Sequence, residues 1–381
     1  MSPVVLVTGG FGLVGAHTSA ILLQRGHIVV ALDLRTPKTE AAAASLAEKG
    51  HPGRLIPSWT DLRDPAAVDS VVDEHLPTAI VHLAAIVSPP CYVNPAIARA
   101  VNVDGTRNLV DAASHLPSPP FFVQASSSAV YGSRNPWLTP EPIDPETPVH
   151  PIDIYGQDKV DAENLVIASG MQHCLMRLGG IVSPELLNNR SRPYRVLQRA
   201  IPRDTRIHAV DVRDVALAFA NAVDRAGDID GEVFLIGGNS TYAFLQRDFE
   251  DEVLDALGIG PLGPHASLPG DPHDSEGWGF TDWFDTSSSQ QALDFQQHDW
   301  EQTRQWLVEH LGPTPGRVAK IAPLLRMLLR AQGRAQRILE RRGPYADPWT
   351  FIAKEYGPHV LVDRRAPAGA GSHKAYRAGI S

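Results

Sequence analysis

The sequence has few cysteines and no long apolar run. Its two cysteines, Cys91 and Cys174, lie in no CxxC motif and have no histidine at ligand spacing, so we expect neither a disulfide framework nor a metal site. No run of about 18 apolar residues occurs, and no basic leader precedes the apolar segment that begins near residue 3. We therefore expect a cytoplasmic protein that is neither exported nor membrane-spanning.

An excess of positive charge is also missing. The 381 residues include 34 Lys and Arg against 43 Asp and Glu, which gives a formal net charge of −9. Nucleic acid is therefore not an expected partner, because neutralising its phosphates needs a basic surface. With 43% apolar and 20% charged residues, the chain is typical of a globular protein long enough for an α/β domain and a second lobe.

A glycine-rich segment follows the first predicted strand. The apolar run 4–7 predicts a buried strand, and TGGFGLVG at 8–15 leads into a predicted helix. In such a unit Gly9 permits the tight turn, Gly12 lets the backbone approach a pyrophosphate, and Gly15 allows close helix packing. Taken alone, a loop of this kind is also typical of a plain turn.

Carboxylates follow the next two predicted strands. The strand over 27–32 ends at Asp33, where a dinucleotide-binding unit places a carboxylate to accept hydrogen bonds from the adenosine ribose. Asp33 would repel a 2′-phosphate and so favours NAD over NADP, although Arg35 could bind such a phosphate. Asp61, after a strand at 54–57, could meet the adenine edge or could be a turn aspartate.

Predicted helices and strands alternate up to about residue 178. The segments are helices near 38–49, 64–75 and 99–113, and strands at 79–83, 121–125 and 175–178. This alternation predicts repeated βα units and a parallel sheet. Ala84 and Ala85, after the fourth strand, either leave room for a cofactor or are small packing residues.

Hydroxyl groups and a cation lie downstream in an order that suggests proton transfer. The run Ser126–Ser128 leaves the fifth strand at the sheet edge where α/β proteins bind ligands, although serines also cap turns. Tyr155 and Lys159 are four residues apart and so share one face of a helix. An unperturbed phenol has a pKa of about 10, and a nearby ammonium favours its phenolate form.

Together these motifs resemble the extended short-chain dehydrogenase/reductase superfamily, which includes NAD-dependent sugar epimerases and dehydratases. The motifs are TGGFGLVG (8–15), Asp33, HLAA (82–85), NVDGT (102–106), SSSAVYG (126–132), YGQDK (155–159) and VDVRDVA (210–216). The resemblance covers roughly residues 3–310.

The resemblance implies a catalytic set and a cofactor set. Tyr155 would be the acid/base, Lys159 would lower its pKa and hold the nicotinamide ribose, and Ser127 would bind the substrate. The implied cofactor-binding residues are Gly9, Gly10, Phe11, Gly12, Leu13, Val14, Gly15, Asp33, Leu34, Arg35, Asp61, Leu62, Leu83, Ala84, Ala85, Asn102, Ala125, Tyr155, Lys159, Gly179, Gly180 and Ile181. The last three belong to a loop that would lie over the nicotinamide.

The implied activity is NAD-dependent hydride transfer to or from a secondary alcohol or ketone carbon of a small molecule. An epimerase would pass through a transient ketone, and a simple dehydrogenase would exchange its cofactor. Because no carboxylate follows Ser127, a dehydratase is not favoured. The alternatives are an NADP-dependent carbonyl reductase or hydroxysteroid-like dehydrogenase acting on an apolar substrate, and a non-catalytic dinucleotide sensor. Many relatives are homodimers built on helices that correspond to 93–115 and 154–170.

The patterns divide the chain into parts. We expect a dinucleotide-binding Rossmann domain over 1–178, to which 206–238 return, and a substrate-binding lobe over 179–312. A helical extension over 313–363 and a disordered tail over 364–381 follow. The expected fold is α/β, a doubly wound parallel sheet with a smaller C-terminal lobe.

The second lobe has two conspicuous groups of side chains. Arginines gather between 188 and 206 and could clamp a diphosphate, although a solvated basic helix is slightly favoured. Trp278, Phe280 and the pair Trp283–Phe284 could wall a substrate site or form the core of the lobe. We expect a strand at 207–209, a helix over 210–223, a strand over 232–236 and a helix over 241–257.

The helical extension contains an amphipathic helix over 323–342, with arginines on one stripe and apolar residues roughly opposite. A basic amphipathic helix can lie on an anionic membrane. Because this helix contains no Trp or Phe, we favour docking on the protein's own second lobe or on a dimer partner, with the arginines in solvent.

Overall fold

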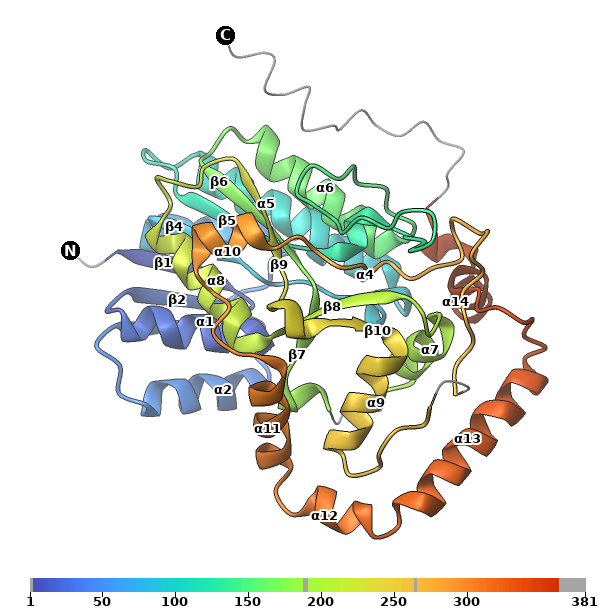
Figure 1. Ribbon diagram of the computed structural model, residues 1–381. Helices are drawn as coiled ribbons and strands as arrows, with labels where there is room; N and C mark the ends of the chain where they lie inside the picture. The colour runs from blue at the N-terminus through green and yellow to red at the C-terminus, as the bar shows by residue number, and fades with distance from the viewer. Residues whose placement is uncertain (1–2, 188–190, 264–265, 363–381) are drawn as a thin grey trace.

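A seven-stranded parallel sheet forms the centre of the computed structural model, which describes residues 3–187, 191–263 and 266–362 (Figure 1). The strand order is β3-β2-β1-β4-β5-β6-β9. The strands are β1 (Val4–Thr8), β2 (Ile28–Asp33), β3 (Arg54–Trp59), β4 (Ala79–His82), β5 (Phe121–Ser127), β6 (His173–Leu178) and β9 (Glu232–Ile236). The predicted doubly wound α/β fold is therefore confirmed.

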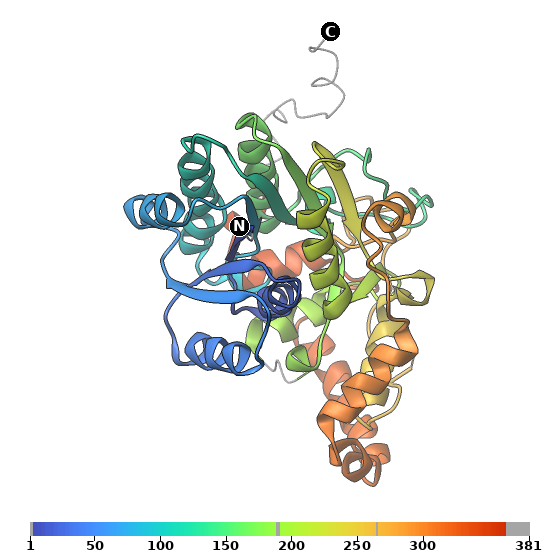
Figure 2. The same ribbon diagram turned by 90° about the vertical axis from the view of Figure 1, so that its left-hand side faces the viewer.

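Helices cover both faces of this sheet, as the end-on view in Figure 2 shows. One face carries α1 (Leu13–Gln24), α2 (Pro37–Glu48) and α8 (Val212–Asp224), and the other carries α3 (Pro65–His75), α5 (Gly105–Ser114) and α6 (Ile154–Ala168). In β1, Val5 and Val7 enter the first core cluster whereas Leu6 enters the second. Burial on both faces explains why the strands are continuous apolar runs in the sequence.

The helix predicted over 99–113 forms, and it contains a π-helical turn. It consists of α4 (Pro95–Arg99), a π-helical turn at Ala100–Asp104 and then α5. The π turn contains Asn102, whose side-chain amide forms two hydrogen bonds with the backbone of Ile86. A local polar contact of this kind leaves no trace in apolar periodicity.

A smaller three-stranded sheet lies beyond the carboxyl ends of the main strands, in the order β10-β8-β7. Its strands are β7 (Gly180–Val182), β8 (Arg206–Asp211) and β10 (Ala243–Leu245). The remaining helices of this region are α7 (Arg192–Ala200), α9 (Gln246–Ala256), α10 (Ser287–Leu293) and α11 (Trp300–Leu311), of which α10 packs against β9 and α8 of the main sheet.

Two predicted helix starts in this region are wrong. The helix predicted from Thr241 begins only at Gln246, because 243–245 pair antiparallel with β8. The helix predicted from Val210 begins at Val212, because Val210 and Asp211 complete β8. Asp211 caps the helix, since its carboxylate accepts a hydrogen bond from the Arg213 backbone N–H at 2.8 Å. Of the segment 206–238, α8 and β9 pack with the main sheet, whereas β8 lies in the small one.

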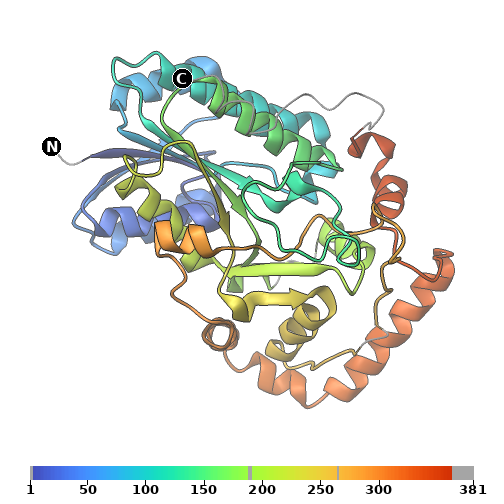
Figure 3. The ribbon, with the colours of Figure 1, turned by 45° about the horizontal axis from the view of Figure 1, so that its top comes forward.

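The C-terminal extension runs around the outside of the molecule, as the rotated view in Figure 3 shows. It consists of α12 (Thr314–Ala319), α13 (Ala322–Leu339) and α14 (Pro348–Tyr356). The predicted amphipathic helix corresponds to α13, but its arginines do not all lie in solvent. Three of them, Arg326, Arg330 and Arg337, donate hydrogen bonds to backbone carbonyls of the chain after α9. No helix among the described residues is long and apolar enough to cross a bilayer.

A buried ion pair attaches α6 to the sheet. The Arg177 guanidinium on β6 donates to both carboxylate oxygens of Glu163, at 3.0 and 2.8 Å, and to the Tyr131 hydroxyl at 2.9 Å. Arg177 is 1% exposed and Glu163 is 3% exposed. Since both charges have left water, each depends on the other for its stability.

Removing one member of this pair should therefore lower the free energy of unfolding. We expect Glu163→Leu to lower the free energy of unfolding by about 3–5 kcal/mol, because Arg177 is left buried and unpaired. The double variant Glu163→Leu/Arg177→Met should recover most of that loss. Denaturant unfolding measures both variants, with Asp224→Leu in the more exposed pair with Arg25 as a control of much smaller effect. A single-variant loss below about 1 kcal/mol would contradict the assignment.

Candidate active site

Ser127, Tyr155 and Lys159 come together where β5 ends. Ser127 is the last residue of β5, paired with Leu178 at the end of β6, and the two other residues lie on the inner face of α6. The Ser127 hydroxyl lies close enough to the Tyr155 phenol to act against the rise of its pKa. The Lys159 ammonium donates to the Ala125 carbonyl at 2.9 Å and lies 6.0 Å from the centre of the Tyr155 ring. One turn of α6 thus aligns the phenol and the ammonium.

Burial acts on both titratable groups of this site. Tyr155 is 7% exposed and Lys159 is 5% exposed. Burial raises the pKa of Tyr155, and the Ser127 hydroxyl opposes that rise. Burial lowers the pKa of Lys159 to about 8, while the carboxylates of Glu163 and Asp158 oppose the fall. At neutral pH the ammonium is therefore still the main form beside a protonated phenol.

The start of α6 is held by a group that the sequence motifs did not reveal. Asp153 is the N-cap: one carboxylate oxygen accepts from the Gly156 N–H at 2.9 Å and the other accepts from the Tyr92 hydroxyl. Tyr92 in turn accepts from the Ser88 hydroxyl at 3.0 Å. Burial raises the pKa of Asp153 to about 6, and these two hydrogen bonds oppose the rise. An aspartate directly before a helix is the one local signal that could have identified it.

The glycine loop forms a cradle that side chains would fill. Gly9 has a φ of +63°, and a Cβ on Gly15 would lie 2.0 Å from the Gly9 carbonyl oxygen. The N-cap of α1, Gly12, offers no side-chain cap, and the first turn of α1 has no acidic residue. The N–H groups of that turn are thus free of side-chain acceptors, as a pyrophosphate site requires.

Asp33 is positioned by the same loop. Its carboxylate accepts hydrogen bonds from the N–H groups of Phe11 at 3.1 Å and Leu34 at 2.8 Å. Burial raises the pKa of Asp33, and these two hydrogen bonds oppose the rise. The exposed Arg35 pairs with Glu40 at 2.7 Å, so its charge is already partly matched.

The other predicted cofactor residues also follow strand ends at this edge of the sheet. Leu34 and Arg35 follow β2, Asp61 and Leu62 follow β3, Leu83–Ala85 follow β4, and Gly179–Ile181 follow β6. Gly180 and Ile181 are not a free loop, because they form β7 and pair with β8. Asp61 forms an ion pair with Arg63 at 2.6 Å, and this contact lowers its pKa. The Asn102 side chain forms its hydrogen bonds with the backbone of Ile86 and so positions the chain after β4.

His82 in the HLAA motif is structural. Its ring nitrogens contact the hydroxyls of Thr8 at 2.6 Å and Thr106 at 2.9 Å. Burial lowers the pKa of His82 to about 3, so the ring is neutral near neutral pH. The Thr8 hydroxyl also accepts from the N–H groups of Leu83 and Ala84, which orients the backbone after β4.

One hydroxyl at the site is buried without a partner. Ser126 is 2% exposed, and its Oγ makes no hydrogen bond with any described residue. Buried polar atoms are normally paired. The unpaired Ser126 Oγ, the uncapped N-terminus of α1 and the Asp33 carboxylate all lie at the carboxyl edge of the main sheet. Together they fit a polar ligand that extends along this edge.

The arginines of 188–206 are not gathered into a clamp. Arg192 pairs with Glu355, Arg199 with Glu340, Arg203 with Asp204 and Arg206 with Asp282. Arg195 also has a protein partner, and Arg190 lies outside the described residues. The arginines of this stretch therefore form ion pairs mainly with the protein's own carboxylates.

The aromatic residues between 278 and 284 are mostly core. Trp278 is fully buried and Phe284 is 5% exposed. The Trp283 indole donates to the Phe244 carbonyl at 2.9 Å. Phe280 packs against Trp349 of α14, with ring centres 5.9 Å apart, beside the cluster that contains Tyr155.

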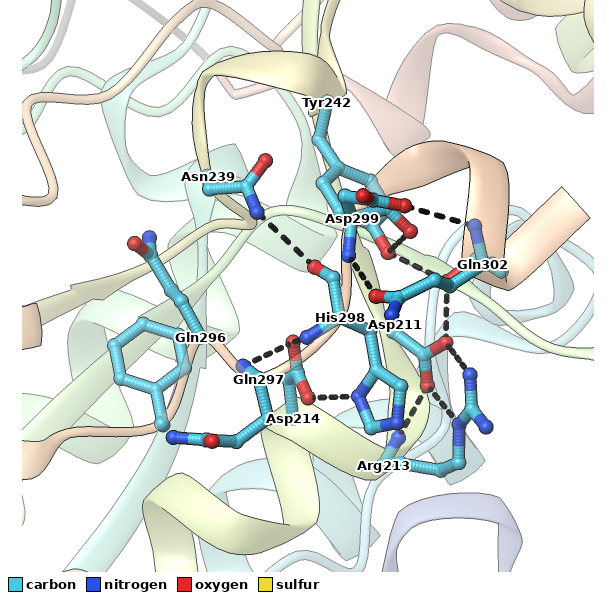
Figure 4. A network of polar contacts seen from close by, with 12 residues as sticks. Asp211, Arg213, Asp214, Asn239, Tyr242, Gln296, Gln297, His298, Asp299 and Gln302 are labelled. Carbon is cyan, nitrogen blue, oxygen red and sulfur yellow. Dashed lines mark hydrogen bonds and ion pairs between the residues drawn. The ribbon is translucent and has the colours of Figure 1, made fainter.

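The VDVRDVA motif holds the end of the second lobe in place, as Figure 4 shows. Asp211 binds Arg213 and accepts from the Thr303 hydroxyl at 2.5 Å, while Asp214 contacts the His298 ring at 2.5 Å. Asp214 also accepts from the backbone N–H groups of Gln297 and His298. These bonds tie α8 to the start of α11, so the motif has a structural role here.

Comparison with known proteins agrees with this arrangement. The family model described as "NAD dependent epimerase/dehydratase family" matches residues 5–237. The UDP-glucose 4-epimerase uge1 of Schizosaccharomyces pombe is 31% identical over 163 residues, which cover 42% of this chain and 45% of that protein. The D-erythronate dehydrogenase of Cupriavidus necator is 31% identical over 167 residues, covering 42% of this chain and 49% of that protein.

The solved structure of Bordetella bronchiseptica WbmH in complex with NAD+ has the same fold. Its TM-score is 0.62 at 22% identity, and the match covers 83% of this chain and 100% of that chain. The curated relatives are matched over about half of their own length only.

Proposed function

The chain belongs to the NAD-dependent epimerase/dehydratase family, and on that basis we propose that it transfers a hydride between NAD and a secondary alcohol or ketone carbon. The observation that carries the proposal is the burial of Tyr155 and Lys159 on one face of α6, with Ser127 at the adjacent end of β5. A matched epimerase and a matched dehydrogenase share this chemistry of alcohol and ketone.

NAD fits the residues at the carboxyl edge of the sheet. The uncapped N-terminus of α1 would hold the pyrophosphate, and Asp33 would accept hydrogen bonds from the adenosine ribose. When bound, the nicotinamide supplies the hydride acceptor or donor. Arg35 is engaged by Glu40, which leaves the negative charge of Asp33 to disfavour a 2′-phosphate.

Tyr155 is the proposed acid/base. In oxidation its phenolate oxygen takes the substrate's hydroxyl proton, and in reduction its hydroxyl returns a proton to the carbonyl oxygen. Ser127 donates a hydrogen bond to the same substrate oxygen and stabilises the charge that develops there. The Lys159 ammonium, 6.0 Å from the centre of the Tyr155 ring, would favour the phenolate because an opposite charge nearby stabilises the ionised form.

The surroundings of Tyr155 support a substrate that is not recognised through a diphosphate. Tyr155 belongs to an apolar cluster that includes Cys91, Val196 and, from α14, Trp349 and Ile352. The arginines of α7 and β8 that could clamp a diphosphate have protein partners. We therefore place a small or partly apolar alcohol ahead of a nucleotide sugar, and dehydrogenation ahead of epimerisation.

Loss of the phenol oxygen should abolish turnover. We expect Tyr155→Phe to reduce kcat by at least a hundredfold, in line with the loss of an acid/base, and to leave NAD affinity nearly unchanged. Lys159→Ala should lower kcat and also weaken NAD binding. Turnover assays and calorimetric NAD titration measure the two effects, with Tyr345→Phe as a control at an exposed tyrosine. A kcat of Tyr155→Phe within about tenfold of the unmodified enzyme would refute the acid/base role. If the protein were instead a non-catalytic dinucleotide sensor, neither the unmodified protein nor any variant would show turnover.

Asp33 should set the cofactor preference. We expect the unmodified protein to bind NAD more tightly than NADP, because a 2′-phosphate would face the Asp33 carboxylate. Asp33→Ala should narrow or invert that preference. Titrating both dinucleotides by calorimetry decides the matter, and tighter binding of NADP by the unmodified protein would mean that Arg35 dominates instead.

We also propose a homodimer formed through the helices of 93–115 and 154–170. Val93 and Ile97, which are 65% and 42% exposed, offer apolar contact area in the first of these segments. Light scattering should give twice the 41.3 kDa chain mass, and Val93→Glu/Ile97→Glu should halve it. A chain-mass particle at micromolar concentration before any substitution would exclude a stable dimer.

A further inference from the structure

Helix α13 turns its arginines toward the protein and its apolar side outward. The contacts with the protein are hydrogen bonds from Arg326 to the Ile259 carbonyl at 2.6 Å, from Arg330 to the Leu262 carbonyl at 2.8 Å and from Arg337 to the Ala266 carbonyl at 2.6 Å. Figures 1 and 3 show α13 at the outer edge of the molecule, with none of the described helices or strands on its outer side. A helix stabilised by an internal apolar face would have the opposite orientation.

The outward side of α13 and its N-cap residue carries an apolar stripe. Its large residues are each more than half exposed, from 52% for Leu328 to 81% for Leu339. We define the stripe as Ile321, Leu324, Met327, Leu328, Ile338 and Leu339. Ala331 and Ala335 are exposed on the same side and connect its two ends. Exposed apolar surface arranged along one helix is a feature of interaction sites rather than of ordinary surfaces.

Positive charge accompanies the stripe, in a chain whose net charge is negative. Residues 313–345 contain eight Lys and Arg and one acidic residue, Glu340. Arg334 and Arg341 are exposed and make no hydrogen bond or ion pair with any residue that the structure describes. A hollow of about 510 Å³ lies beside Ile338 and is lined by four arginines, which include those two. The free charges thus flank the apolar stripe.

An anionic lipid surface is the partner that uses both properties. A second copy of the chain, docked through the same stripe, would bring two sets of arginines together. A nucleic acid would match the charges but would leave the apolar stripe in water. On a bilayer the stripe enters the acyl boundary while arginines meet headgroup phosphates. Tyr345, 42% exposed just after the helix, adds an aromatic side chain suited to the interface.

We propose that α13 is an interfacial helix that holds the protein on an anionic membrane. Its apolar stripe lies in the boundary between headgroups and acyl chains, and Arg334 and Arg341 contact lipid phosphates. The hydrogen bonds from Arg326, Arg330 and Arg337 fix the helix in that orientation. An enzyme held in this way would meet alcohols or ketones that partition into lipid.

Vesicle flotation tests the proposal without any substrate, so its outcome is separate from that of the proposed reaction. We expect the full-length protein to float with vesicles of equal phosphatidylglycerol and phosphatidylcholine, and not with phosphatidylcholine alone. Leu328→Glu/Ile338→Glu should lower the partition coefficient at least tenfold. Leu76→Glu/Leu138→Glu, at two similarly exposed leucines away from α13, adds the same charge and should bind like the unmodified protein.

The arginines provide a second, independent variant. Arg334→Gln/Arg341→Gln breaks no contact within the described protein, so it should keep the thermal midpoint while binding anionic vesicles several-fold more weakly, with less dependence on salt. The proposal is overturned if the unmodified protein does not float with anionic vesicles. It is also overturned if both α13 variants bind these vesicles as tightly as the unmodified protein. It is also overturned if Leu328→Glu/Ile338→Glu halves the mass in light scattering, since the stripe would then be an interface between copies.

Discussion

The candidate site depends on satisfying the charges that α6 buries against the sheet. The inner face of this helix carries Asp158, Lys159 and Glu163, each no more than 5% exposed. Apolar burial cannot hold such a face, because each isolated charge would cost several kcal/mol to remove from water. The helix is held instead by specific partners: Arg177 for Glu163, Arg99 for Asp158 and the Ala125 carbonyl for Lys159. Their geometry determines the position of Tyr155.

Burial and charge also explain why the site has its proposed chemistry. The surroundings of Tyr155 are apolar, so its pKa rises, and the phenol resists ionisation until positive charge is close. The Lys159 ammonium lies 6.0 Å from the centre of the Tyr155 ring. Burial lowers its pKa to about 8, which is still above neutral, so it keeps its proton near neutral pH. The N-cap of Asp153 and its contact with Tyr92 keep the start of α6 in register with Ser127. A small displacement of α6 would move Tyr155 away from Ser127, and the two are proposed to act on the same substrate oxygen.

Local patterns in the sequence predicted the parts of this structure that depend on local rules. The apolar strands, the glycine loop, Asp33 and the spacing of Tyr155 and Lys159 each reflect neighbours in the chain, and they lie at one edge of the sheet. The pairs that lock the site could not be predicted in the same way, because Arg177 and Glu163, or Tyr92 and Asp153, meet only through tertiary packing. The orientation of α13 was predicted in reverse for the same reason. Amphipathicity identifies the two sides of a helix but does not say which side faces the protein.

We propose that positive charge beside Tyr155 makes its phenol ionise within reach of neutral pH when NAD is bound. Ultraviolet difference titration measures this ionisation against the background of the eight tyrosines in the chain. With oxidised NAD present, one tyrosine of the unmodified protein should ionise well below the others. That step should be absent in Tyr155→Phe and should move to higher pH in Lys159→Met. Superimposable titration curves for the unmodified protein and Tyr155→Phe below the ordinary range of phenols would contradict the claim.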